Sequence, residues 1–360
     1  MDGGQIPVID VGPLVAASGA PASRNPTSGD PAPRTPTSGD PALQRVAEEI
    51  GAACRESGFF YVVGHGVDAG LQARLEEQSR AFFALGLEEK MRVRMPLAGA
   101  AWRGYFPVGD ELTSGRPDVK EGLYFGIELP ADDPRVVAGL PLHGPNLMPE
   151  RPAGLGATVL AYTAAMTSLG HALMRGVALS LGLGPRYFEE RFTATPTTLF
   201  RIFNYPAVDA PGGGERWGVG EHTDYGLLTM LRQDGNAGLE VRSRRGDAWV
   251  PAPPVAGSFV CNIGDMLDRL TGGHYRSTPH RVVPSMGRDR ISWPFFFDPS
   301  WDADVRPVGR GVLAGAASAT GGEPSRRWDG VDLAGVTGTY GEYLLGKVGK
   351  VFPQLRSQVL

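Results

Sequence analysis

The sequence from Gly220 to Leu231 reads GEHTDYGLLTML, and it places a histidine and an aspartate two positions apart, at His222 and Asp224. In an extended strand, side chains at positions i and i+2 point to the same face. We therefore expect the imidazole and the carboxylate to converge on one point beside a strand. An isolated pair of this kind is more often found at a surface turn, so the surrounding sequence has to support the interpretation.

A second histidine with strand-like surroundings supplies that support. His280 lies in the run STPHRVV, residues 277–283. Two histidines and one carboxylate, with the other coordination positions open, are the ligand set of non-haem iron(II) oxygenases. A structural role is the alternative for His280 alone. The order of the three residues along the chain favours a metal site formed by His222, Asp224 and His280.

An arginine and a serine follow at the same spacing, Arg290 and Ser292, and the apolar run PFFF begins at residue 294. Both side chains would lie on one strand face. A guanidinium group with a nearby hydroxyl suits a carboxylate that needs several donors. A surface salt bridge is the alternative for Arg290, and the apolar run that follows argues against it.

The composition limits the class of protein. The chain has 360 residues, 42% of them apolar, and a formal net charge of -4, which allows a large core and gives no basic stripe for nucleic acid. No apolar run approaches the roughly 18 residues that a membrane span needs, and the N-terminus lacks the pattern of a signal peptide. Cys54 and Cys261 lie in apolar settings and predict two buried thiols. We expect a cytoplasmic monomer that acts on a small molecule.

The fold class follows from many short strand-like segments separated by Gly and Pro turns. We predict a mainly β protein with flanking helices, built on a distorted double-stranded β-helix, the jelly roll. Helical periodicity predicts helices over 43–57, 69–84 and 155–183, and a last helix over 339–350 packed outside the barrel. The predicted strands are 6–11, 59–63, 198–205, 227–233, 239–242, 249–250, 258–263, 280–283 and 290–297.

The chain divides into four predicted regions that form one globular unit. A mixed α/β region covers 1–150, a backing helix region 151–194, the jelly-roll core 195–305 and a C-terminal segment with its helix 306–360. Within the first region, residues 18–41 hold a direct repeat rich in Pro, Ser, Thr and Gly, for which we predict a disordered insertion. The aromatic stretch from Trp102 to Phe125 is expected to be irregular, either as a cover over the core or as a pocket wall.

These motifs together resemble the Fe(II)- and 2-oxoglutarate-dependent dioxygenases of the isopenicillin N synthase type, over nearly the whole chain. The resemblance implies a distorted jelly roll and iron bound by His222, Asp224 and His280. It also implies 2-oxoglutarate held by Arg290 and Ser292, with Tyr205 bonding its carboxylate. The matching segments are 6–10, 58–67, 204–206, 222–224, 262–265, 277–282 and 290–292, of which 262–265 is implied to be a structural strand and turn.

The resemblance implies an enzyme of secondary metabolism that hydroxylates, desaturates or cyclises a small molecule and uses O2, with release of succinate and CO2. Segments 113–118, 143–145 and 270–274 are partly similar to the ethylene-forming enzyme, whose reaction we do not carry over. An oxidase that uses no 2-oxoglutarate is the runner-up. A zinc hydrolase and a binding protein without activity are further alternatives.

Four residues are candidates for the substrate pocket. Arg201 and Phe203 share a strand face with Tyr205 by their i, i+2 spacing. Phe296 lies on the strand that carries the arginine and serine, and Tyr124 belongs to the aromatic stretch. Loops that form such pockets change specificity with few substitutions, so these residues predict a pocket and not one particular substrate.

Overall fold

The computed structural model describes residues 6–18, 40–208, 217–244, 246, 248–308, 329–330 and 332–353. The predicted insertion at 18–41 lies almost wholly outside these ranges. Its two ends are described: Ser18 follows a short helix, and Pro41 opens the next one. Within the described residues, no helix has both the length and the apolar content that a membrane crossing requires.

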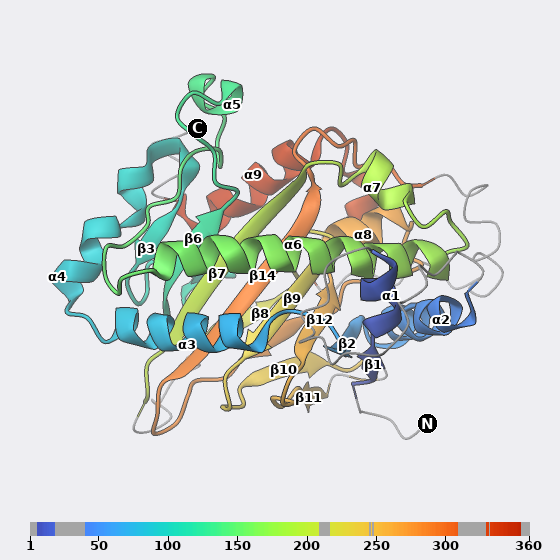
Figure 1. The fold of residues 1–360 in the computed structure, drawn as a ribbon, viewed down its shortest axis with the longest axis horizontal. Helices are drawn as coiled ribbons and strands as arrows, with labels where there is room; N and C mark the ends of the chain where they lie inside the picture. The colour runs from blue at the N-terminus through green and yellow to red at the C-terminus, as the bar shows by residue number, and fades with distance from the viewer. Residues whose placement is uncertain are drawn as a thin grey trace, which may run out of the picture.

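A large twisted sheet forms the centre of the molecule (Figure 1). Neighbouring strands are antiparallel except for the first pair, which is parallel. The strand order across the sheet is β1 (Val8–Asp10), β2 (Phe59–Val63), β12 (Phe259–Ile263), β9 (Leu228–Gln233), β14 (Arg290–Ser300), β7 (Pro196–Tyr205), β6 (Glu121–Gly126) and β3 (Gly104–Phe106).

A second, smaller sheet packs against one face of the large sheet, and the two sheets together form the predicted jelly roll. Its order is β11 (Trp249–Pro251), β10 (Leu239–Arg242), β13 (His280–Val282) and β8 (Val219–His222), and a two-stranded ribbon joins β4 (Leu112–Thr113) to β5 (Arg116–Pro117).

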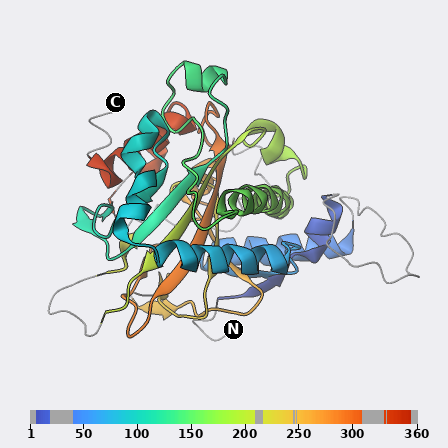
Figure 2. The same ribbon diagram turned by 60° about the vertical axis from the view of Figure 1, so that its left-hand side comes forward.

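The long helix α6 (Leu155–Ser180) covers the outer face of the large sheet and is seen nearly end-on in Figure 2. Its predicted apolar stripe is buried throughout: Tyr162, Met166, Leu169, Leu173 and Val177. Beside it lie α2 (Pro41–Glu56), capped by the Asp40 side chain, and α3 (Ala69–Phe83), capped by Asp68. The remaining helices are α1 (Gly12–Ala17), α4 (Leu87–Lys90), α5 (Pro134–Val137), α7 (Tyr187–Arg191), α8 (Asp265–Leu270), α9 (Tyr340–Val351) and the 3-10 turns Met91–Val93, Met95–Ala101 and Leu333–Gly335.

One expectation of the sequence is wrong: the stretch 102–125 is not irregular, since it supplies β3 and most of β6. Strand β6 reads EGLYFG, whose glutamate and two glycines are disfavoured in strands. The structure accommodates them because the buried Glu121 pairs with Lys90 at 2.7 Å. At Gly122, a Cβ atom would lie 2.5 Å from the Phe106 ring, so only glycine fits there.

The position of the last helix also differs from the prediction. We expected it to pack outside the barrel, but Leu344, Lys347 and Val351 of α9 line the central cavity. The two cysteines are free and buried, as predicted. The large sheet takes strands both from 1–150 and from 195–305. The four-region division itself stays a prediction.

Candidate metal and co-substrate site

Two side chains from the small sheet and one from the segment that follows β8 meet at one point. His222 ends β8 and is paired directly with His280, the first residue of β13. Oδ1 of Asp224 lies 3.8 Å from Nε2 of each histidine. The three potential ligand atoms all lie within 4.8 Å of one another. The prediction that one strand holds both His222 and Asp224 is wrong in one respect, because Asp224 lies beyond the end of β8, in the segment that leads to β9.

Backbone carbonyls orient both imidazoles. Nδ1 of His222 lies 2.8 Å from the carbonyl oxygen of Gly220, and Nδ1 of His280 lies 3.3 Å from that of Thr278. A carbonyl can only accept a hydrogen bond, so we infer that Nδ1 carries the proton in each ring. The lone pair then resides on Nε2, the atom that faces Asp224 in both cases.

The Asp224 carboxylate is oriented by two hydrogen bonds to its far oxygen. Oδ2 accepts one from Thr229 Oγ1 at 2.6 Å and one from Asn262 Nδ2 at 2.7 Å. Oδ1 is thereby left toward the histidines. Neither hydrogen bond was predicted: Asn262 was expected only to be part of a structural strand and turn, and no role was expected for Thr229. Each is the strand residue paired with the other across β12 and β9.

The protonation states of these groups suit a divalent cation. Burial and, to a smaller extent, the neighbouring His222 lower the pKa of His280 to about 4, against the opposing effect of Asp224. Burial also lowers the pKa of His222. Burial would raise the pKa of Asp224, but the two histidines and the two hydrogen bonds outweigh it and lower the pKa. Two neutral imidazoles and one carboxylate are the donor set that fits iron(II).

Arg290 lies deeper in the same cavity and is fully buried. Its Nη2 donates to Oε1 of Gln233 at 3.0 Å, and its Nε donates to the carbonyl oxygen of Asn236 at 3.2 Å. The guanidinium also lies 4.9 Å from the centre of the Tyr205 ring. Nη1 is buried without a hydrogen-bond partner among the described residues. A buried cation in this state fits an anionic ligand.

The other two predicted co-substrate residues lie beside this guanidinium. Tyr205 pairs with Arg290 across β7 and β14, and the hydroxyl groups of Ser292 and Tyr205 are 3.5 Å apart. All of these groups line one cavity of about 500 Å³ that also contains the histidine and aspartate cluster. A volume of this size is typical of small-molecule sites.

Of the four predicted pocket residues, Arg201, Phe203 and Phe296 line the cavity. Tyr124 does not line it: its ring centre lies 4.2 Å from the Arg201 guanidinium, and it lines a separate small cavity. A charged group on the same wall was not predicted: Glu111 and Lys120 line the cavity, and Lys120 also pairs with Asp118, which does not line it. The dense alternation of charges between 110 and 121 was the available signal.

The comparisons with known proteins agree with this site. The family model described as the 2OG-Fe(II) oxygenase superfamily matches residues 196–299, and the one described as the N-terminal part of the non-haem dioxygenase in morphine synthesis matches 30–151. A Dictyostelium discoideum protein named "Probable iron/ascorbate oxidoreductase" is 49% identical over 88% of this chain and 91% of its own length. The chain belongs to the 2OG-Fe(II) oxygenases.

Further relatives and a solved structure extend this result. A homoarginine-6-hydroxylase of Glycine max is 35% identical over 96% of this chain and 97% of its own length. A full-length protein of Neurospora crassa, solved in complex with alpha-KG, superposes with a TM-score of 0.73 at 25% identity over 97% of each chain. The predicted reaction class and co-substrates are thereby confirmed: the enzyme is an iron(II)- and 2-oxoglutarate-dependent dioxygenase, of a family that typically acts on small molecules.

Proposed function

We propose that His222, Asp224 and His280 are the iron ligands of this dioxygenase. The observation that carries the assignment is the convergence of two neutral imidazole nitrogens and one carboxylate oxygen on a single cavity. Each ligand is oriented by a hydrogen bond on its far side, the arrangement that fixes metal ligands in proteins.

We further propose that Arg290, Ser292 and Tyr205 bind the carboxylate of 2-oxoglutarate that is remote from the iron. The unpartnered Nη1 of Arg290 supports this role, because a buried guanidinium gains a counter-charge and a hydrogen bond from such a group. When iron(II), 2-oxoglutarate and O2 are bound, they supply the oxidant for a substrate C–H bond, with release of succinate and CO2.

For the substrate, we propose a small molecule that carries both a carboxylate and a cationic group, as a basic amino acid does. The relatives named homoarginine-6-hydroxylase, such as those of Glycine max and rice at 35% and 38% identity, point in this direction. The cavity wall of this chain supports it through two charged groups, which we consider in turn.

Arg201 is suited to the substrate carboxylate. Its guanidinium lies between the rings of Tyr124 and Phe296, 4.2 and 4.8 Å from their centres. Its closest carboxylate, Glu111, is 3.7 Å away, and its Nε is buried without a hydrogen-bond partner. Rings on both sides hold the group in place while Nε has no partner, which suits a carboxylate site.

The opposite charge is provided by Glu111 and Asp118. Nζ of Lys120 lies 2.8 Å from Oε2 of Glu111 and also pairs with Asp118, so one ammonium group faces two carboxylates. Once Arg201 pairs with a substrate carboxylate, this wall retains an excess negative charge. A cationic group of the substrate would restore the balance.

One further reaction has support among the relatives. A 1-aminocyclopropane-1-carboxylate oxidase of Dictyostelium discoideum is 37% identical over 86% of this chain. The runner-up is therefore an oxidase that turns over without consuming 2-oxoglutarate. Measurement of succinate against product distinguishes the two reactions, since the dioxygenase forms them in equal amounts and the oxidase forms product without succinate.

The ligand assignment is tested with His222→Ala and Asp224→Ala. Each variant should fold, as judged by circular dichroism and thermal unfolding, and should lose iron-dependent turnover. Persistent activity in either variant would overturn the assignment. Arg290→Leu should weaken 2-oxoglutarate binding far more than iron binding, whereas equal loss of both would make the arginine structural.

The substrate class is tested by succinate release with L-homoarginine, L-arginine and L-lysine, compared with apolar amino acids and neutral phenols. We expect stimulation by a basic amino acid. Arg201→Met should then raise KM for that amino acid and leave KM for its decarboxylated amine unchanged. Stimulation only by neutral compounds, or an equal effect of the substitution on acid and amine, would contradict the proposal.

A further inference from the structure

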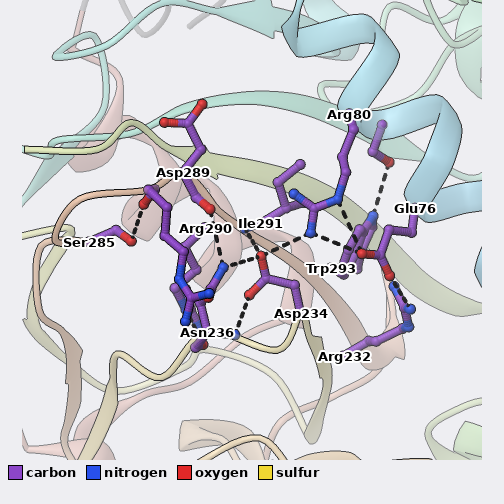
Figure 3. Close-up of polar contacts among 12 residues, drawn as sticks. Glu76, Arg80, Arg232, Asp234, Asn236, Ser285, Asp289, Arg290, Ile291 and Trp293 are labelled. Carbon is purple, nitrogen blue, oxygen red and sulfur yellow. Dashed lines mark hydrogen bonds and ion pairs between the residues drawn. The ribbon is translucent and has the colours of Figure 1, made fainter.

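A buried aspartate holds the chain segment between the two residues proposed to bind the 2-oxoglutarate carboxylate. Asp234 directly follows β9, and its side chain is fully buried. Its Oδ2 accepts a 2.8 Å hydrogen bond from the backbone N–H of Ile291, the residue between Arg290 and Ser292. Figure 3 shows this carboxylate at the centre of a polar network.

This hydrogen bond takes the place of a backbone–backbone hydrogen bond at the end of the pairing between β9 and β14. The last pair of that ladder is Ser292 with Gln233. Beyond it, the N–H of Asp234 still donates to the carbonyl oxygen of Ile291, but the N–H of Ile291 donates to the aspartate side chain. On the side that faces β9, the Arg290 end of β14 is therefore held by one carboxylate, while β7 pairs with its other side.

The same carboxylate orders a turn that contacts Arg290 directly. Oδ1 of Asp234 accepts from the N–H of Asn236, and Oδ2 accepts from the Asn236 side chain, at 2.9 and 3.0 Å. The side-chain amide of Asn236 also donates to the carbonyl oxygen of Asp289 at 3.2 Å, while the backbone carbonyl oxygen of Asn236 accepts from Nε of Arg290. Asp234 and Asn236 thus fix the backbone on both sides of Arg290, and Asn236 also binds its guanidinium.

The counter-charge for Asp234 comes from a different part of the chain. Nη2 of Arg80, on helix α3, lies 3.2 Å from Oδ2 of Asp234, and no other cation of the described residues pairs with this aspartate. Arg80 also bonds Glu76 one helical turn away, and Glu76 in turn pairs with Arg232 at 2.6 Å. Figure 3 shows Arg80 reaching from the helix to the carboxylate.

We infer that Arg80, Asp234 and Asn236 are positioning residues for Arg290, which link helix α3 to the proposed binding site of the 2-oxoglutarate carboxylate. The inference rests on the proposed role of Arg290. The three residues touch neither the iron ligands nor the cavity. Their loss should therefore weaken recognition of the remote carboxylate and leave iron binding unchanged.

The test compares two ligands that differ in that carboxylate. 2-Oxoglutarate has it, whereas oxalate can chelate iron but lacks it. Arg80→Ala is the main variant, because the Arg80 side chain is 43% exposed and its removal leaves no cavity in the core. Arg74→Ala is the matched control, since it removes an exposed arginine from the same helix. Both dissociation constants are measured by anaerobic calorimetry on the iron(II)-loaded protein.

We expect Arg80→Ala to raise the dissociation constant of 2-oxoglutarate roughly 10-fold, the size typical of residues that orient a ligand-binding group. Oxalate and iron(II) should bind as in the wild type, and Arg74→Ala should change nothing. Equal weakening of both ligands, or unchanged 2-oxoglutarate binding, would overturn the inference, even if the variant unfolds at a lower temperature.

Asp234→Asn provides a second test. Both oxygens of Asp234 accept hydrogen bonds from N–H groups, so an amide must place its own NH2 against a donor in either orientation. The same selective loss of 2-oxoglutarate binding is expected. Arg290→Leu distinguishes a failure of the proposed function from a failure of this inference. If Arg290→Leu retains wild-type affinity, the proposed function fails; if only the Arg80 and Asp234 variants retain it, this inference fails alone.

Discussion

The side-chain amide of Asn262 donates a 2.7 Å hydrogen bond to Oδ2 of Asp224, on the side of the carboxylate that faces away from the two histidines. Thr229 donates to the same oxygen. Both donors lie on neighbouring strands of the large sheet, while the histidines lie on the small sheet. The large sheet therefore orients the one proposed iron ligand that no strand of the small sheet holds.

The first prediction follows from this arrangement. Asn262→Ala and Thr229→Val should each weaken iron(II) binding roughly 10- to 100-fold, because the carboxylate loses a hydrogen bond that fixes its orientation. The measurement is an anaerobic competition titration against a chelator. Cys261→Ala is the control for general destabilisation, since Cys261 is the buried neighbour on β12 and its side chain points to the other face. Loss of iron affinity in the control as well would contradict a specific role.

The second prediction concerns the pH dependence of stability. Burial raises the pKa of Asp298 to about 7, while a hydrogen bond from Tyr340 opposes the rise. The unfolded chain releases this proton near pH 3.9. The folded state binds the proton more tightly, so this group's contribution to stability is complete below about pH 4 and is lost as the pH rises to about 7.

Asp298→Asn should remove that part of the pH dependence. The free energy of unfolding of both metal-free proteins is measured with urea. The value for the variant minus the value for the wild type should increase from pH 4 to pH 7. Tyr340→Phe should shift the loss to higher pH, because the hydrogen bond that favours the charged carboxylate is gone. A constant difference between wild type and Asp298→Asn across this range would contradict the raised pKa.

The site could be predicted to the extent that its chemistry lies in short motifs. Two histidines, one aspartate and an Arg-x-Ser pair are recognisable in one dimension, and the structure brings them into one cavity. Asp224 nevertheless lies outside the predicted strand and owes its position to the segment after β8 and to hydrogen bonds from Thr229 and Asn262. Such donors come from distant strands, and no local pattern predicts which strand will be adjacent.

Contacts between residues distant in the sequence also explain why strand β6 and the position of helix α9 were not predicted. Strand β6 carries a glutamate that is stable in the core only because Lys90 reaches it from another element. The contact between Arg80 and Asp234 joins residues far apart in sequence. Helix α9 was predicted from its periodicity, but its position over the cavity depends on contacts such as the Tyr340 hydrogen bond to Asp298. Propensity predicts the elements, whereas contacts between residues distant in the sequence decide where they lie.

The third prediction concerns the buried charge cluster. Lys120→Met should lower the free energy of unfolding by about 3–5 kcal/mol, because Glu111 and Asp118 would remain buried without their ammonium partner. Lys350→Met, which removes an exposed lysine at the cavity rim, should change it by less than about 0.5 kcal/mol. Similar stability of the two variants in urea unfolding would contradict this account of the cluster.

The fourth prediction compares glycines in two helices. An alanine is normally favoured over glycine inside a helix by about 1 kcal/mol. At Gly170 of α6, however, a Cβ atom would lie 2.3 Å from the ring of Phe297 on β14, so the helix packs on the sheet through the absence of a side chain. Gly170→Ala should destabilise the protein by about 1–3 kcal/mol, the cost typical of overpacking.

Gly346 of α9 is the matched position, because a Cβ atom there meets nothing within 4 Å. Gly346→Ala should therefore show the intrinsic effect alone and stabilise the protein by about 0.5–1 kcal/mol. Opposite signs for the two variants in urea unfolding would establish that contact with β14, rather than helix propensity, selects glycine at 170. If both substitutions stabilise, α6 can move away from the sheet, and the close packing does not constrain this residue.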